Sequence, residues 1–104
     1  MKDSDLDRVL EIDPHNTFAL TTCGEVYNLF NKYDQAKTDL DRVLKIDSDN
    51  IFALITCVFI YWNLQNYEQE LVDLNRILKI DQQNKAALII RGDIYSRLGN
   101  GNYD

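Results

Sequence analysis

The sequence predicts an all-α protein in which helical hairpins stack into a solenoid, and two repeated blocks are the basis of this prediction. The first block occurs three times, as DLDRVLEIDPHN at residues 5–16, DLDRVLKIDSDN at 39–50 and DLNRILKIDQQN at 73–84. The second block is FALTT at 18–22 and FALIT at 52–56. Both blocks recur after 34 residues. A period of this length is typical of arrays whose units bury their apolar faces against their neighbours.

Each period contains two helices, because apolar residues recur at helical spacing and polar turns separate the runs. Leu40, Val43 and Leu44 form an i, i+3, i+4 stripe. An asparagine stands before the first helix of each pair, at positions 16, 50 and 84, where its side chain can accept a hydrogen bond from an otherwise unpaired backbone N–H. Asp34 and Glu68 stand near the start of a second helix, where the macrodipole favours negative charge. The predicted helices span residues 3–12, 17–30, 34–46, 51–64, 68–80 and 85–98.

The 104 residues are expected to form one domain with four parts. Residues 1–16 are the second helix of a partial repeat, 17–50 and 51–84 are whole repeats, and 85–104 are the first helix of another partial repeat with a glycine-rich end. Neither terminal helix has the polar face of a capping helix. Either the chain is a short product or a segment of a longer array, or its terminal half-repeats dock head to tail and make a homo-oligomer.

The composition favours a folded protein with protein partners. Apolar residues make up 45% and charged residues 27%, which is ordinary for a folded domain. A formal net charge of −6 disfavours nucleic acid as a partner. The start, MKDSDLDR, is charged where a secretory signal needs an apolar core, so we expect a cytoplasmic or nuclear protein. The uncharged run IFALITCVFIYWNL at 51–64 is shorter than the roughly 20 residues of a membrane span, so no membrane partner is expected.

We expect no catalytic site, cofactor or metal. The one histidine, His15, stands in a turn without a second ligand at metal-binding spacing. Cys23 and Cys57 are one period apart on adjacent helices, and helix axes about 8 to 10 Å apart disfavour a disulfide, so both are interpreted as small core residues. No glycine-rich phosphate loop, nucleophile elbow or pair of catalytic carboxylates is present in the sequence. The chain is therefore not expected to be an enzyme.

The first whole repeat carries a pattern of residues that points to a known family. Leu20, Cys23, Gly24 and Tyr27 are followed by Ala36-x3-Leu40 and preceded by Pro14. This arrangement resembles the W-x2-L-G-x2-Y, A-x3-F and P pattern of the tetratricopeptide repeat family. The resemblance covers nearly the whole chain and implies a right-handed α-solenoid. It also implies that the first helices line a concave groove in which members of the family bind peptides or partner helices.

Two further sets of residues lead to specific expectations. Glu70 stands where the preceding repeat has Ala36, a position that normally faces the partner helix. Because an unpaired buried charge is costly, we expect the Glu70 side chain to reach solvent or the helix to shift. Arg8, Arg42 and Arg76 each follow an aspartate by three residues, so we expect weak ion pairs within the helix.

The middle first helix is predicted to carry two apolar faces. Leu54, Cys57, Val58 and Tyr61 match the core positions of the neighbouring repeats. The other face is a stripe at i, i+3, i+7 and i+10. Its members are Phe52, Ile55, Phe59 and Trp62. In the first repeat the equivalent positions hold Phe18, Thr21, Glu25 and Asn28, and in the third they hold Ala86, Ile89, Asp93 and Ser96.

We interpret this stripe as the centre of a partner-binding groove. The aromatic patch consists of Phe52, Phe59 and Trp62, and polar residues surround it as in a protein-binding hot spot. The rim is formed by Glu25, Asn28, Asp93 and Arg97. Alternatively, these side chains fold onto each other and cover the core.

These observations predict a scaffold or adaptor module that binds a peptide or helix of a protein partner in its concave groove. The alternative is a structural segment that self-associates or acts as a spacer through its terminal half-repeats. Some members of the family hold a peptide carboxylate with Lys, Asn and Arg, but the comparable places here are Thr21, Glu25 and Thr56, with Arg91 and Arg97 further along. A helical or extended apolar ligand is therefore expected instead of an acidic tail.

Overall fold

The computed structural model describes the backbone of residues 4–99 and the side chains of residues 5–99. Within these residues the secondary structure is entirely helical, as predicted. The helices are α1 Ser4–Ile12, α2 Thr17–Leu29, α3 Tyr33–Ile46, α4 Ile51–Asn63, α5 Tyr67–Ile80 and α6 Lys85–Arg97. Every described boundary lies within one residue of its predicted position. The predicted helix start at residue 3 and most of the glycine-rich end, residues 100–104, lie outside the described residues.

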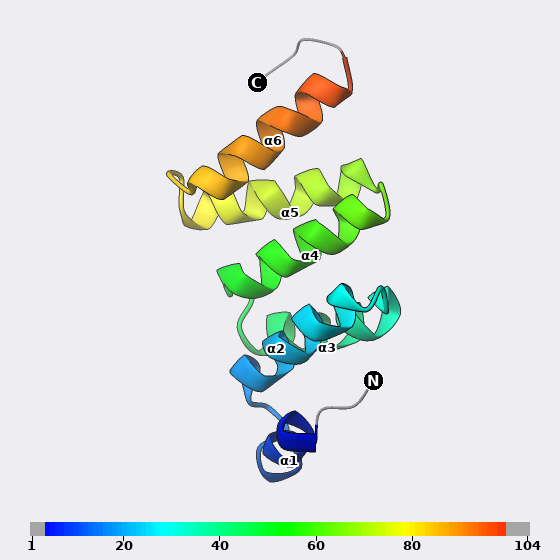
Figure 1. Cartoon of the computed structure of the whole chain (residues 1–104). Helices are drawn as coiled ribbons and strands as arrows, with labels where there is room; N and C mark the ends of the chain where they lie inside the picture. Colours follow the sequence, from blue (N-terminus) through cyan, green and yellow to red (C-terminus); the bar gives the residue numbers. More distant parts are fainter. Residues whose placement is uncertain (1–3, 100–104) are drawn as a thin grey trace.

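The helices stack along one direction, from α1 at one end to α6 at the other (Figure 1). The chain is elongated, with extents of 49 × 26 × 18 Å. The most extensive contacts join α2 to α3 and α4 to α5, and α2 also contacts α4 directly. The first helices α2 and α4 are therefore neighbours, which is the arrangement that a groove between them requires.

Asparagine caps begin the first helices as predicted. In α2, α4 and α6 the cap oxygen accepts the backbone N–H of the residue three positions later, at 2.9, 3.0 and 2.9 Å. The caps are Asn16, Asn50 and Asn84. The ends of α2 and α4 are also equivalent, because Asn31 (φ 61°) and Gln65 (φ 57°) have left-handed backbone conformations one period apart. These residues reverse the chain and start the second helices.

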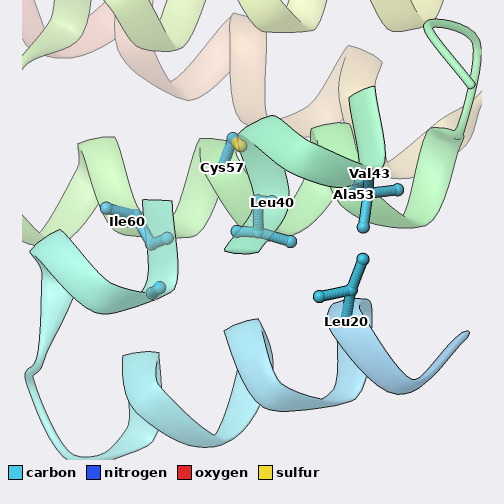
Figure 2. Packing of buried hydrophobic residues seen from close by; sticks show 7 residues of the cluster. Leu20, Leu40, Val43, Ala53, Cys57 and Ile60 are labelled. Carbon is cyan, nitrogen blue, oxygen red and sulfur yellow. The ribbon is translucent and has the colours of Figure 1, made fainter. Parts of the chain in front are cut away.

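The core lies between successive helices and divides into two clusters. The first joins α2, α3 and α4, and Figure 2 labels six of its side chains, which lie in the space between these helices. These are Leu20, Leu40, Val43, Ala53, Cys57 and Ile60. The second joins α4, α5 and α6 through residues that include Leu54, Leu74 and Ile94. Cys57 is thus a core residue as expected, whereas Cys23 is only partly buried.

The arginines of the second helices donate hydrogen bonds to the preceding repeat, and their charges also stabilise the aspartates three residues earlier on their own helices. The Arg42 guanidinium donates to the Pro14 carbonyl oxygen at 3.2 Å, and Arg76 donates to the Ser48 carbonyl oxygen at 3.1 Å. Each arginine reaches back 28 residues to the turn that ends the previous repeat. The repeated arginines therefore join each repeat to the preceding one through a hydrogen bond.

The expectation that Glu70 reaches solvent is wrong. Its side chain is 1% exposed, and neither carboxyl oxygen has a hydrogen-bond partner among the described residues. Helix α5 keeps its place because Leu74 and Ile77, on the same face, are fully buried. Rotating the helix to expose Glu70 would also expose these two apolar side chains.

Within residues 4–99, none of the helices combines the length and the apolar character needed to cross a membrane.

Candidate functional site

The surface between α2 and α4 contains two adjoining hollows, which we call the α2–α4 groove. One hollow has a volume of about 330 Å³ and the other about 260 Å³. The first is lined by Thr17, Phe18, Thr21, Thr22, Glu25, Asn50 and Phe52. The second is lined by Glu25, Asn28, Leu29, Phe52, Ile55, Thr56 and Phe59. Glu25 and Phe52 belong to both hollows, so one continuous ligand could occupy the two.

Three phenylalanines give the α2–α4 groove its apolar character. Phe18 is 82% exposed, Phe52 77% and Phe59 42%. Exposed aromatic rings grouped in a hollow are the usual anchors of protein interfaces. Ile55 lies between them in the stripe and is partly buried. The structure thus brings together six of the nine residues that the sequence predicted as the site.

The opposite face of α4 packs in the core. Leu54, Cys57 and Val58 are all fully buried. Helix α4 is therefore apolar on two sides for two reasons, since one side fills the core and the other side supplies Phe52 and Phe59 to the groove. This explains why the helix has no charge along its whole length.

The remaining three predicted residues form a separate cluster between α4 and α6. The Arg97 guanidinium carbon lies 5.1 Å from the centre of the Trp62 ring, within the range of a cation–π contact. Arg97 Nε also lies 3.0 Å from Asp93 Oδ2 in an ion pair. None of the three lines either described hollow. Trp62 thus contacts the α6 arginine and does not continue the phenylalanine surface.

Polar side chains of the groove are held in place by their own helices. The Thr21 hydroxyl donates to the Thr17 carbonyl oxygen at 2.7 Å, and the Thr56 hydroxyl donates to the Phe52 carbonyl oxygen at 2.9 Å. At the far end of the groove, Asn63 Nδ2 donates to Asn28 Oδ1 at 3.3 Å and joins α4 to α2. The hydroxyls of both threonines are therefore already bonded within their own helices.

Sequence reasoning missed several residues that line the α2–α4 groove. They are Thr17, Thr22, Asn50 and Leu29. A signal for two of them was present, because Thr22 and Leu29 follow Phe18 and Glu25 by four positions and so share their side of α2. Asn50 was identified only as a helix cap, although its position at the start of α4 also places it beside the first hollow.

A second group of polar residues surrounds Cys57, outside the groove. Lys37 Nζ lies 3.0 Å from Asp41 Oδ1, 4.0 Å from Cys57 Sγ and 5.0 Å from the centre of the Tyr61 ring. Burial raises the pKa of the Cys57 thiol to about 11, although the Lys37 charge opposes the shift. The thiol is therefore protonated at neutral pH, when it is a weak nucleophile. Within the described part of the chain, no three His, Cys, Asp or Glu side chains form a group that could hold a metal ion.

This fold and groove define a class of protein, the helical repeat proteins that present a groove across successive first helices. A sequence model described as "Tetratricopeptide repeat" matches residues 19–50. The solved structure described as "First TPR of Spaghetti (RPAP3) bound to HSP90 peptide SRMEEVD" is similar, with a TM-score of 0.82 and 20% sequence identity. The similarity covers 91% of this chain and 77% of that chain. No curated protein matches the sequence.

Residues 19–50 thus match the tetratricopeptide repeat family, and the chain as a whole has the fold of a tetratricopeptide repeat domain.

Proposed function

We propose that the chain is a protein–protein interaction module that holds a peptide or helix of a partner in the α2–α4 groove. The observation that supports this most directly is the exposure of Phe18, Phe52 and Phe59 along two adjoining hollows. An apolar side chain left in water gains about 25 cal/mol for each Å² that a partner covers. The similar solved structure holds a peptide, which supports a peptide as the general class of ligand.

The division into repeats belongs to the same proposal. We propose that residues 17–50 and 51–84 act as whole repeats, between partial repeats at 1–16 and 85–104. The extensive packing of α2 on α3 and of α4 on α5 supports this frame. The frame matters for function because it makes α2 and α4 equivalent first helices, so that a ligand in the α2–α4 groove would meet equivalent positions of both.

Selection from a displayed library of random peptides tests this function. Phe52→Ala removes the ring shared by both hollows, and its wild-type exposure means that the fold does not depend on it. Loss of a central anchor is expected to weaken the selected peptides by about 2 kcal/mol, roughly 30-fold. Phe30→Ala is the matched control, because Phe30 is also exposed but lines neither hollow. Equal binding by both variants would contradict a role for the groove.

Self-association through the terminal helices is a second candidate function. Val9 and Ile12 on α1 and Leu88 on α6 are exposed, and Ile12 is 85% exposed. Such surfaces can stack head to tail between molecules. Sedimentation velocity across a wide concentration range tests this candidate. A species that grows with concentration supports it, and a monomer throughout the micromolar range contradicts it.

A further inference from the structure

The charge of the α2–α4 groove comes from one residue. Glu25 is the charged residue among those that line the two described hollows, and it lines both. Its side chain is exposed, and no ion pair or hydrogen bond joins it to another described residue. The carboxylate is therefore available to a ligand in either hollow, the one lined by Phe18 and Phe52 or the one lined by Phe52 and Phe59.

The cations that could receive an acidic ligand near the groove are already engaged. Arg97 is paired with Asp93 at 3.0 Å and stacks on Trp62. Arg91 donates to the Asn75 side-chain oxygen at 3.0 Å. The hydroxyls of Thr21 and Thr56, within the hollows, donate to backbone carbonyl oxygens. A ligand carboxylate would thus meet Glu25 without a compensating cation, in a chain whose net charge is −6.

We infer that the occupant of the α2–α4 groove is an apolar peptide with a lysine or arginine placed opposite Glu25. The inference rests on the proposed groove function and adds the charge of the ligand. The peptide cation would pair with the carboxylate while the adjacent rings of Phe18 and Phe52 attract it through their faces. Apolar peptide residues on either side would fill the two hollows.

Charge also argues against a second copy of the chain as the occupant. Two grooves facing each other would bring two Glu25 carboxylates together, and each copy would add its own net charge of −6. Like charges opposed at an interface select against that pairing. An acidic peptide of the kind held by the similar solved structure meets the same obstacle.

The test uses a displayed library of random 12-residue peptides selected on the whole wild-type chain. The strongest peptide is then synthesised in three forms, with Lys, Gln or Glu at its selected basic position. Binding is followed by the fluorescence of Trp62, the one tryptophan of the sequence, or by peptide anisotropy. Glu25→Gln is expected to weaken the lysine form by about threefold and Glu25→Lys by about tenfold. The glutamine form is expected to change by less than about twofold.

Two control variants separate the possible explanations. Glu11→Lys changes the net charge as much as Glu25→Lys does, but Glu11 is exposed near the end of α1 and lines neither hollow. It is expected to leave the lysine form bound within about twofold, and higher salt should reduce the effect of Glu25→Lys. Phe52→Ala reports on the groove itself, whatever the charge of the ligand.

Each outcome has one meaning. Enrichment of basic apolar peptides whose binding depends on Glu25 and not on Glu11 supports the inference. Enrichment of acidic or neutral peptides that depend on Phe52, or equal effects of the two charge reversals, overturns the inference and leaves the groove function standing. Binding that ignores Phe52, or no enrichment at all, overturns both.

Discussion

Replacing Glu70 by methionine is expected to stabilise the protein. The side chain is 1% exposed, and Oε1 and Oε2 have no hydrogen-bond partner among the described residues. Each buried polar group without a partner costs about 1–3 kcal/mol, and a charged group costs more. Methionine is also unbranched and adapts to irregular gaps, so it fills the space without the polar atoms.

The size of the effect follows from two opposing contributions. Removal of the unpaired carboxyl should gain about 1–3 kcal/mol. Loss of a negative charge from the first turn of α5 should cost up to about 1 kcal/mol. The net increase in the free energy of unfolding is therefore about 1.5 kcal/mol at neutral pH. For a domain of this size, that corresponds to a rise in Tm of roughly 10 °C.

The gain should depend on pH. Burial raises the pKa of Glu70 above its ordinary value of 4.5, Arg97 opposes the shift and Asp93 adds to it. From pH 4.5 upward to the folded pKa, the folded chain binds more protons at this site than the unfolded chain. The free energy of unfolding of the wild type therefore falls as pH rises through this window. The advantage of Glu70→Met should be larger at pH 7 than near pH 4.

Thermal unfolding of both proteins, followed by circular dichroism at the two pH values, provides the measurement. Glu68→Met is the matched control, because it removes the same charge from an exposed position of α5 and should change stability by less than about 0.5 kcal/mol. Ala36→Glu is the reciprocal change, at the equivalent buried position, and should destabilise by about 3 kcal/mol or more. A Glu70→Met variant that is no more stable than wild type, or equally favoured at both pH values, would refute the reasoning.

Two further predictions concern the core. A Cβ at Gly24 would lie 2.8 Å from Leu40 Cγ, so Gly24→Ala should lower the free energy of unfolding, measured in urea, by about 1 kcal/mol. A Cβ at Gly92 would meet nothing within 4 Å, so Gly92→Ala should raise it by about 1 kcal/mol. Changes of the same sign in the two variants would contradict this prediction. The Cys23→Ser variant keeps one thiol, Cys57, which is buried and has a pKa of about 11. This thiol should react with iodoacetamide at pH 8 only as fast as the protein opens. Labelling at the rate of a free thiol would contradict this expectation.

The helices and their caps were predictable because each signal is local and repeated. Asn16, Asn50 and Asn84 accept from the N–H three residues later, and this bond needs only the helix itself. The contacts of Arg42 and Arg76 were not predictable in the same way. Each guanidinium had a nearby aspartate on its own helix, and only the folded array shows a carbonyl group 28 residues earlier within hydrogen-bond distance.

The burial of Glu70 could not be predicted from its own chemistry. Sequence reasoning assumes that a charge avoids the core when it can. Here the helix orientation is determined by Leu74 and Ile77, which are four and seven residues further on and fully buried. Their burial outweighs the cost of one carboxyl group, so the glutamate remains inside.

A comparison of equivalent positions explains why the period predicts where the candidate groove lies but not which ligand charge it favours. Positions 25, 59 and 93 are one period apart, on equivalent helices, and hold Glu, Phe and Asp. The shared position accounts for Glu25 and Phe59 lining the same hollow. The two acidic residues differ in whether a cation neutralises them. Asp93 is paired with Arg97 four residues later, whereas the residue four positions after Glu25 is Leu29. The α2 side of the groove therefore has a negative charge without a paired cation, and we expect a positively charged group of the ligand to bind there.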